Sequence, residues 1–305
     1  MKRHLAFMKE LVTKGGPDSS EYQELTDWLG TVRKELNNGK LTKKDIQLLR
    51  DEMGEALSIL TLQGFVFSKP HGYPGDYEII EKIYLEHTSN DPELRKWDLF
   101  FQLQKAPMAV RNRKKYFIDL LNGLDGLKQI DTSNRVLNVA SGPARDLFDF
   151  FSQKSDRKLF FDNIEFDPLA ISYAKNLCKD FLKSIEFLHT NAFDFTTNNK
   201  YRLIWSAGLF DYLNDKKFIF LLNHLIPLLD NDGELVIGNF SSGNPTQAYM
   251  EIIGDWQLNH RTPEQLISLA KACNFKASDI RIGKESQGVN LFLHLKCGKD
   301  FIPQI

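Results

Sequence analysis

The chain has 305 residues, which exceeds the usual size of one domain and predicts either one large domain or two joined parts. Its composition is that of a globular protein, with 42% hydrophobic residues, 26% charged residues and a net charge of −1 at pH 7. This balance excludes a global basic surface for nucleic acid and an acidic tail.

Residues 1 to about 130 have a helical pattern and almost no strand-like runs, with apolar side chains at helical spacing. Residues 1–14 are interrupted by charges, so they lack the apolar region of a signal peptide. The most apolar stretch, residues 218–229, contains polar residues and Pro227 and is too short to span a membrane. We therefore expect a soluble, cytoplasmic protein with no membrane span.

A Pro- and Gly-rich break interrupts this helical region at residues 68–75. Two prolines and two glycines within eight residues cannot lie inside a helix. The segment carries His71 and Tyr73 and is followed by Asp76 and Tyr77. It fits a lid over a cofactor pocket, and it equally fits an ordinary turn between two helices.

Strand and helix patterns alternate from residue 134 onward. We predict strands at residues 136–140, 159–165, 185–189, 202–207 and 234–240, with helices after all of these except the third. This alternation predicts a mostly parallel sheet with helices on both faces. The last two strands, at residues 279–283 and 290–297, have no helix between them and should form an antiparallel hairpin.

Small residues follow the first predicted strand. In residues 136–146 an apolar run leads through Ala140, Ser141 and Gly142 into a helix, which lets the backbone approach a ligand. Glu165 ends the next strand, where a carboxylate can accept both ribose hydroxyl protons. This pattern predicts a nucleotide site. The alternative is a doubly wound sheet that binds no nucleotide here.

The type of nucleotide is restricted by the spacing of the small residues. A dinucleotide fingerprint needs G-x-G-x-x-G, whereas the three positions here are Ala140, Gly142 and Arg145. The failed fingerprint disfavours a nicotinamide-dependent oxidoreductase. A cofactor without phosphate tolerates a looser loop.

These segments resemble the motifs of class I S-adenosylmethionine-dependent methyltransferases over about residues 107–297. Residues 136–146 resemble the first motif, with Asn138 at the usual acidic position. Ala140, Gly142 and Ala144 stand at its three glycines, so one glycine is kept. The terminal hairpin matches the antiparallel seventh strand of that fold.

The other motifs of this family assign further cofactor contacts by resemblance. Glu165 would hold the ribose and Phe166 would cover the adenine. The segment Asn191, Ala192 and Phe193 resembles the third motif, in which a side chain reads the adenine edge. The segment that begins at Ser206 resembles the fourth motif, beneath the reacting methyl group.

The resemblance implies a Rossmann-like seven-stranded α/β methyltransferase sheet whose last strand is antiparallel. Residues 1–106 would form an N-terminal helical cap or lid, and residues 107–305 the methyltransferase domain. The cofactor would be S-adenosyl-L-methionine, and no metal is implied. Arg111 or Arg113 could pair with the carboxylate of the cofactor's methionine portion, although a solvated basic helix face is the alternative.

Four segments resemble a narrower bacterial group that includes enzymes of 3-hydroxypalmitic acid methyl ester biosynthesis. They are residues 69–77, 109–113, 208–212 and 256–262. This resemblance implies methyl transfer to the carboxylate of a hydroxylated fatty acid. Another small-molecule N- or O-methyltransferase, or a non-catalytic protein with this fold, remains an alternative.

The residues predicted to place the acceptor are His71, Tyr73, Tyr212 and Arg261. A carboxylate is already ionised at neutral pH and needs only a cation or hydrogen-bond donor to position it. An amine or hydroxyl would need a general base, for which His71 or Asp76 are candidates. Trp97, Phe100 and Phe101 could form an acyl groove.

The remaining predictions concern partners and cysteines. We expect a small-molecule acceptor and no nucleic acid, and the N-terminal helices could cap the site, form a homodimer or do both. Cys178, Cys273 and Cys297 are odd in number and widely spaced, which favours free, buried thiols in a reducing compartment.

Overall fold

The computed structural model describes residues 1–126, 134–154 and 156–296. The chain forms two compact units, one of Met1–Met108 with Asn244–Gln257 and one of Ala109–Gly243 with Leu258–Ile305. The sequence predicted the boundary between the two parts at residue 106 and assigned residues 244–257 to the C-terminal domain. In the structure, that segment packs instead with the N-terminal helices.

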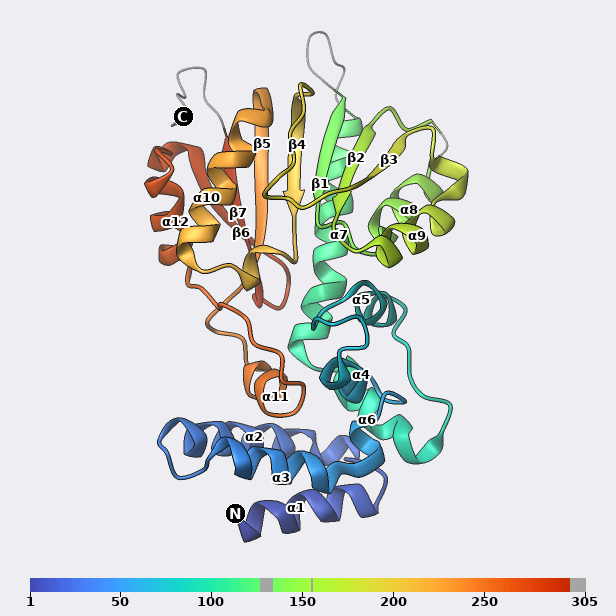
Figure 1. The fold of residues 1–305 in the computed structure, drawn as a ribbon, viewed down its shortest axis with the longest axis vertical. Coiled ribbons are helices and arrows are strands. Elements are labelled where there is room, and N and C mark those ends of the chain that lie inside the picture. Colours follow the sequence, from blue (N-terminus) through green and yellow to red (C-terminus); the bar gives the residue numbers. More distant parts are fainter. Residues whose placement is uncertain (127–133, 155, 297–305) are drawn as a thin grey trace. The chain divides into compact units, whose positions relative to one another are not determined.

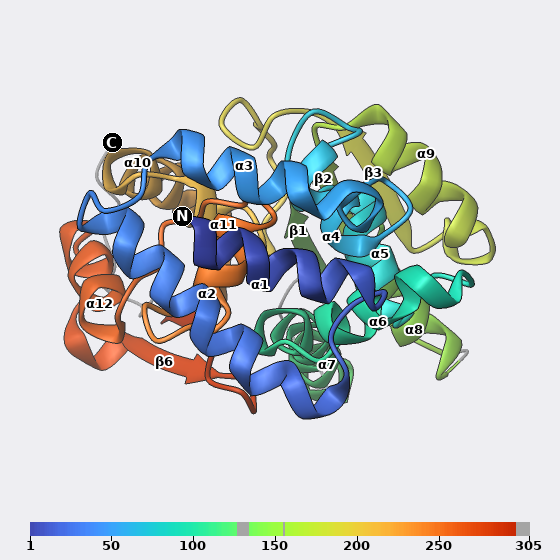
Figure 2. The same ribbon diagram turned by 90° about the horizontal axis from the view of Figure 1, so that it is seen from below.

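The first unit is helical, as the sequence predicted. Its α-helices are α1 (Lys2–Thr13), α2 (Tyr22–Asn37), α3 (Lys43–Met53), α4 (Leu62–Ser68), α5 (Tyr77–Tyr84), α6 (Pro92–Gln102) and α11 (Gln247–Ile252), with short 3-10 turns η1 (Ser19–Glu21) and η2 (Gly54–Leu57). Helix α3 packs along α1, and α11 contacts α2 (Figures 1 and 2).

Side-chain caps fix where the helices of this unit begin. Thr42, Thr61, Asp76 and Asp91 each accept a backbone N–H bond from the first turn of the helix that follows. The predicted break is confirmed, because α4 ends at Ser68 and α5 begins at Tyr77.

Long-range polar contacts hold α11 and its flanks in the helical unit. Tyr249 Oη donates to Gln63 Oε1 at 2.6 Å, and Arg33 Nε donates to Glu251 Oε2 at 2.6 Å. Arg50 donates to the backbone carbonyls of residues 251 and 252. These bonds explain why a segment so late in the chain belongs to the N-terminal unit.

The aromatic residues proposed for an acyl groove lie in the core of this unit. Trp97, Phe100 and Phe101 are buried, and the rings of Phe100 and Phe101 both pack edge-on against Tyr249. Phe100 and Phe101 pack between α6 and α11, and Trp97 is fully buried, so a groove-lining role for them is not supported.

The second unit is built on one seven-stranded sheet. Its strands are β1 (Arg135–Val139), β2 (Phe160–Glu165), β3 (Ile185–His189), β4 (Tyr201–Ser206), β5 (Leu229–Phe240), β6 (Ile280–Lys284) and β7 (Asn290–Lys296), in the order β3-β2-β1-β4-β5-β7-β6 (Figure 1). The first five strands are parallel, and β7 is antiparallel to both β5 and β6. The predicted parallel sheet and terminal hairpin are confirmed.

Two details of the strands differ from the prediction. β5 begins at Leu229, five residues earlier than expected, and its pairing with β4 shifts register between Tyr201 and Leu203. Asp232 has a φ of 52° in this stretch, so the first part of β5 is irregular. The expected last residue of β7, Cys297, lies outside the described residues. Cys178 and Cys273 are buried and form no disulfide among the described residues.

Helices cover both faces of the sheet. They are α8 (Arg145–Ser152), α9 (Pro168–Leu177), α10 (Asp215–Leu225), α12 (Pro263–Ala272) and α7 (Lys105–Asp125), which begins in the first unit and continues into the second. Alternate strand residues point to opposite faces. Val136 and Val236 therefore pack with Phe117 of α7, whereas Leu137 and Leu235 pack in the core with α10 and α12.

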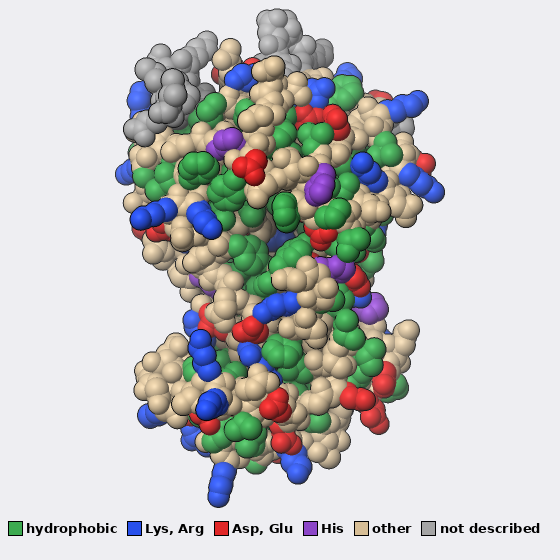
Figure 3. Space-filling model, viewed as in Figure 1, with side chains coloured by type: hydrophobic (Ala, Val, Ile, Leu, Met, Phe, Trp, Pro, Cys, Tyr) green, Lys and Arg blue, Asp and Glu red, His purple; other side chains and the backbone are tan. Residues whose placement is uncertain are grey.

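The surface carries both signs of charge. On the face shown in Figure 3, basic and acidic side chains are interspersed on both units, in keeping with a net charge of −1. Within the described ranges, no helix combines the length and the apolar character that are needed to cross a membrane.

Candidate functional site

The candidate site lies where parallel strands end. β1 ends at Val139, β2 at Glu165 and β4 at Ser206, so their following loops share one edge of the sheet. The strand order reverses between β1 and β4, and open α/β sheets bind ligands at such a switch point.

The loop after β1 has an unusual backbone. Ala140, Gly142 and Ala144 all have left-handed conformations, with φ values of 55°, 57° and 54°. A Cβ at Gly142 would meet no atom within 4 Å, so the loop faces open space at this position. The two alanines therefore occupy glycine-like backbone positions at a cost of about 1–2 kcal/mol each.

Replacement of Ala140 by glycine should stabilise the protein by about 0.5–1 kcal/mol, because relief of left-handed strain exceeds the added entropy of the unfolded chain. Urea unfolding measures this free energy. Ala207→Gly is the control, because Ala207 does not have a positive φ, and this variant should lose stability. A less stable Ala140→Gly variant would contradict the strain argument.

Glu165 ties the ends of β1 and β2 together. Its Oε2 accepts the Gly142 N–H at 2.9 Å, and its Oε1 accepts the N–H groups of Phe166 and Asp167 at 2.8 and 3.0 Å. A carboxylate offers about four lone-pair sites, and three are used here. The predicted contact to both ribose hydroxyls therefore requires that at least one of these backbone N–H hydrogen bonds to Glu165 is broken.

Four buried polar atoms around this edge lack a protein partner among the described residues. They are Arg113 Nε, Asn138 Nδ2, Ser141 Oγ and Asn163 Oδ1, and Asn163 of β2 is the strand partner of Asn138. Arg113 is 8% exposed, and its Nη1 donates to the carbonyl of Ala207, directly after β4, at 3.1 Å. Buried polar groups are normally satisfied, so this set points to a polar ligand at the edge formed by β1 and β4.

Two buried acids near Arg113 were not identified as site residues from the sequence. Burial raises the pKa of the Asp146 carboxyl to about 6, and it raises the pKa of the Asp211 carboxyl to about 6 as well. Asp146 accepts the Leu147 N–H, and Asp211 accepts the Phe240 N–H at 2.6 Å. The charge of Arg113 opposes both shifts, so both carboxyls lie within electrostatic reach of its guanidinium. Both lie in segments that resemble family motifs, residues 136–146 and 208–212, but neither acid was assigned a role of its own from the sequence.

Asp211→Asn should stabilise the protein at alkaline pH. Between pH 3.8 and about 6 the folded chain holds more protons at Asp211 than the unfolded chain, so stability falls as pH rises through this window. Asparagine keeps an acceptor for Phe240 and never ionises. We expect a gain of about 1–3 kcal/mol at pH 8 and little gain at pH 4, measured by urea unfolding. A variant that is less stable at pH 8 would contradict this.

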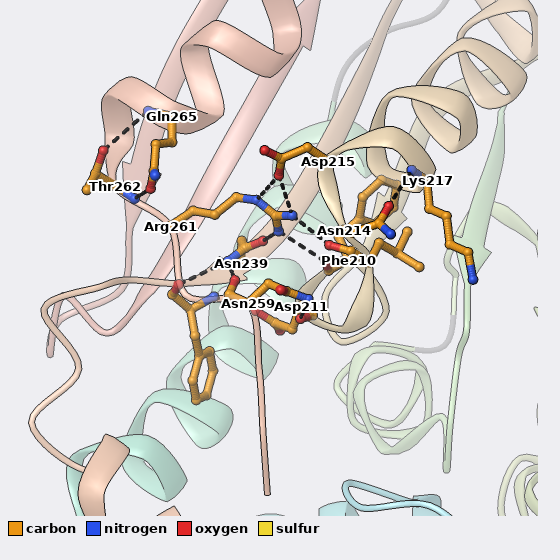
Figure 4. Close-up of polar contacts among 12 residues, drawn as sticks. Phe210, Asp211, Asn214, Asp215, Lys217, Asn239, Asn259, Arg261, Thr262 and Gln265 are labelled. Atoms are coloured by element: carbon orange, nitrogen blue, oxygen red, sulfur yellow. Dashed lines mark hydrogen bonds and ion pairs between the residues drawn. The ribbon is translucent and has the colours of Figure 1, made fainter. Parts of the chain in front are cut away.

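The Arg261 guanidinium forms hydrogen bonds within the second unit. Its Nε and Nη2 bond Asp215 Oδ1, its Nη1 donates to Asn239 Oδ1 at 2.7 Å, and its Nη2 also donates to the Leu213 carbonyl at 2.6 Å (Figure 4). Nη1 further donates to the carbonyl of Phe210, and the guanidinium lies over the Phe218 ring. All three nitrogens are engaged and the side chain is buried, so the predicted role of Arg261 in placing an acceptor is not supported.

The same hydrogen bonds also fix the turn η4 (Phe210–Tyr212) after β4. The Asp211 carbonyl accepts the backbone and side-chain N–H groups of Asn259, so the turn is held from both sides (Figure 4). Tyr212 lies in this turn and is 38% exposed.

The other predicted cofactor residues lie at or near the same edge. The Phe166 side chain is 68% exposed after β2, and Ser206 Oγ donates to the Val139 carbonyl at 3.1 Å. Asn191 Oδ1 accepts the Phe193 N–H, Ala192 is buried, and the Phe193 ring stacks on Phe220.

His71 and Tyr73 belong to the helical unit. His71 Nε2 lies 3.0 Å from Glu78 Oε2, and its ring packs on Tyr77. Asp76, the other candidate base, caps α5 because its Oδ1 accepts the N–H groups of residues 78 and 79.

Comparisons with known proteins identify the fold. No protein-family model and no curated protein matches the sequence. Among solved structures, the chain is similar to a possible exported protein from Bordetella parapertussis, with a TM-score of 0.60, 16% identity and coverage of 97% of this chain and 96% of that one.

Two similar structures are methyltransferases. Magnesium protoporphyrin IX methyltransferase from Synechocystis PCC 6803 with bound SAH has a TM-score of 0.52 and 10% identity, covering 77% of this chain and 99% of that one. The S-adenosylmethionine-dependent methyltransferase SibL has a TM-score of 0.51 and 12% identity, covering 84% and 73%. The chain thus has the Rossmann-like methyltransferase fold with an N-terminal helical region, and the predicted fold class is confirmed.

Proposed function

We propose that this chain is an S-adenosylmethionine-dependent methyltransferase that binds its cofactor at the carboxyl edge of β1, β2 and β4. The observation that carries the proposal is the set of buried, unpartnered polar atoms on Arg113, Asn138 and Ser141, beside the left-handed loop. Two proteins with the same fold are methyltransferases, which supports this choice of ligand.

Several of the proposed cofactor residues have surroundings that suit their roles. Arg113 supplies an unpartnered donor for a carboxylate, and Ser141 and Gly142 present small groups on an open loop. Glu165 has one lone-pair site left for a ribose hydroxyl. In this proposal the exposed Phe166 ring covers the adenine, and residues 191–193 contact the edge of the adenine.

The proposed cofactor supplies an activated methyl group on a sulfonium. The protein's task is to align the acceptor with this group and to exclude water. The turn η4, held by Arg261 and Asn259, presents Tyr212 after the end of β4.

We further propose a carboxylate acceptor, such as a hydroxylated fatty acid, which would leave as a methyl ester. The four segments that resemble the methyl ester group support this choice. A carboxylate has a reference pKa of roughly 4 and needs no general base at neutral pH. Since the donors of Arg261 are used internally, Tyr212 is the candidate in the second unit to place the acceptor. His71 and Tyr73 stay predictions from the sequence.

The test combines binding and turnover. Purified protein is titrated with S-adenosylmethionine by calorimetry and then incubated with labelled cofactor and a panel of hydroxylated fatty acids. Extractable, base-labile label supports an ester, whereas base-stable label points to nitrogen or ether oxygen. Binding without transfer to any small molecule would indicate a non-catalytic protein, and no binding at high ligand concentration would contradict the proposal.

A further inference from the structure

A buried histidine links a helix to the sheet in the second unit. His294 on β7 is 1% exposed, and its Nε2 lies 2.7 Å from Tyr116 Oη on α7. Its Nδ1 lies 2.7 Å from Glu234 Oε1 on β5. The three side chains form a continuous phenol–imidazole–carboxylate chain that the proposed reaction does not use.

The proton positions in this chain follow from the chemistry of its ends. A carboxylate only accepts, so His294 Nδ1–H donates to Glu234, and the other ring nitrogen, Nε2, shares the hydrogen bond with the Tyr116 hydroxyl. Arg281 Nη2 also lies 2.7 Å from Nδ1, but a guanidinium only donates and cannot bond a nitrogen that carries hydrogen. Arg281 is 60% exposed and pairs instead with Glu234 at 3.7 Å.

These two hydrogen bonds hold α7 against the sheet at Tyr116, which lies close to Arg113 along the helix. Tyr116 follows Arg113 by three residues, so both lie on the same helix face. The Tyr116 ring stacks on Phe292 at 3.9 Å, and the Phe117 ring stacks on Trp205 at 4.5 Å. Stacked rings resist separation but define position along the sheet poorly, whereas a hydrogen bond is directional.

A glycine makes room for the tyrosine hydroxyl. A Cβ on Gly283 of β6 would lie 2.3 Å from Tyr116 Oη, and 3.2 Å from His294 Nε2. The bond to His294 therefore depends on the missing side chain at Gly283. Removal of the tyrosine hydroxyl would also remove the closest of these contacts.

We propose that Tyr116, His294 and Glu234 are positioning residues that fix where α7 presents Arg113 to the carboxylate of the cofactor. This inference rests on the proposed function. It predicts a ligand-selective effect, because S-adenosylmethionine carries the carboxylate that Arg113 would bind, whereas 5′-methylthioadenosine lacks the amino-acid portion. Loss of the tyrosine bond should affect the first ligand and spare the second.

The experiment measures both affinities by calorimetry on the full chain. Tyr116→Phe should weaken S-adenosylmethionine binding by roughly three- to tenfold, the value of one net hydrogen bond, and 5′-methylthioadenosine binding by less than about twofold. Gly283→Ala should give the same selective loss, because it displaces the same hydroxyl. In the Tyr116→Phe background, Gly283→Ala should add less than about a further twofold loss.

Tyr201→Phe is the matched control. It removes a buried hydroxyl that donates to Asp162 Oδ2 at 2.6 Å, at the first residue of β4 and far along the strand from the site edge. It should lower the melting temperature without changing the ratio of the two affinities. Equal losses for both ligands in Tyr116→Phe or Gly283→Ala, or a selective loss in Tyr201→Phe, would overturn the inference. Absence of S-adenosylmethionine binding by the unaltered protein would instead contradict the proposed function.

Discussion

Replacement of Arg113 by methionine should weaken S-adenosylmethionine binding by about a hundredfold, since removal of one partner of a buried charge pair costs about 2–5 kcal/mol. Methionine keeps an apolar stem of similar reach and removes the charge. The Arg113 guanidinium is buried, is held by the Ala207 carbonyl and has an unpartnered Nε, so it is prepared for an anionic partner. Binding of 5′-methylthioadenosine should change much less, because that ligand has no carboxylate.

Calorimetric titration of both ligands at pH 7.5 measures this difference. Arg111→Met is the control, because Arg111 lies two positions earlier on the same helix and was the alternative partner from the sequence. It should leave both affinities within about threefold of the unaltered protein, as expected for a side chain that does not contact the ligand. A large, selective loss in Arg111→Met with little change in Arg113→Met would transfer the role to Arg111.

The fold was predictable because its signals are local. Val136 and Leu137 pack on opposite faces of the sheet, and this alternation is visible in the sequence as a short apolar run. The absence of a helix between residues 283 and 290 predicted the terminal hairpin. The place of residues 244–257 was not predictable, because its bonds, such as Tyr249 to Gln63, join residues 186 positions apart.

The site was predictable in outline but not in the use of its side chains. The small residues after β1 were visible, yet only the backbone reveals that Ala140 and Ala144 are left-handed. Arg261 carries a charge that suggested an anion site, whereas its partners are Asp215, Asn239 and backbone carbonyls. A sequence shows which groups are charged, but partners depend on tertiary packing.

Glu165→Ala should weaken binding of S-adenosylmethionine and of 5′-methylthioadenosine to similar extents, by about a hundredfold, as expected for one or two hydrogen bonds to a charged group. Both ligands contain the ribose, so the loss should not distinguish them, in contrast to Arg113→Met. The variant should also lose stability, because three backbone N–H groups lose their common acceptor.

Glu165→Gln separates the two roles of the carboxylate. Its single amide oxygen cannot serve both Gly142 on one side and residues 166–167 on the other, as the two carboxylate oxygens do. We therefore expect an affinity between those of the unaltered protein and Glu165→Ala, with melting temperatures in the same order. Asp167→Asn, which keeps the cap on α9, is the control and should bind both ligands normally. If Glu165→Ala melts at a lower temperature but binds both ligands with unchanged affinity, Glu165 only holds the loop, and the ribose assignment is wrong.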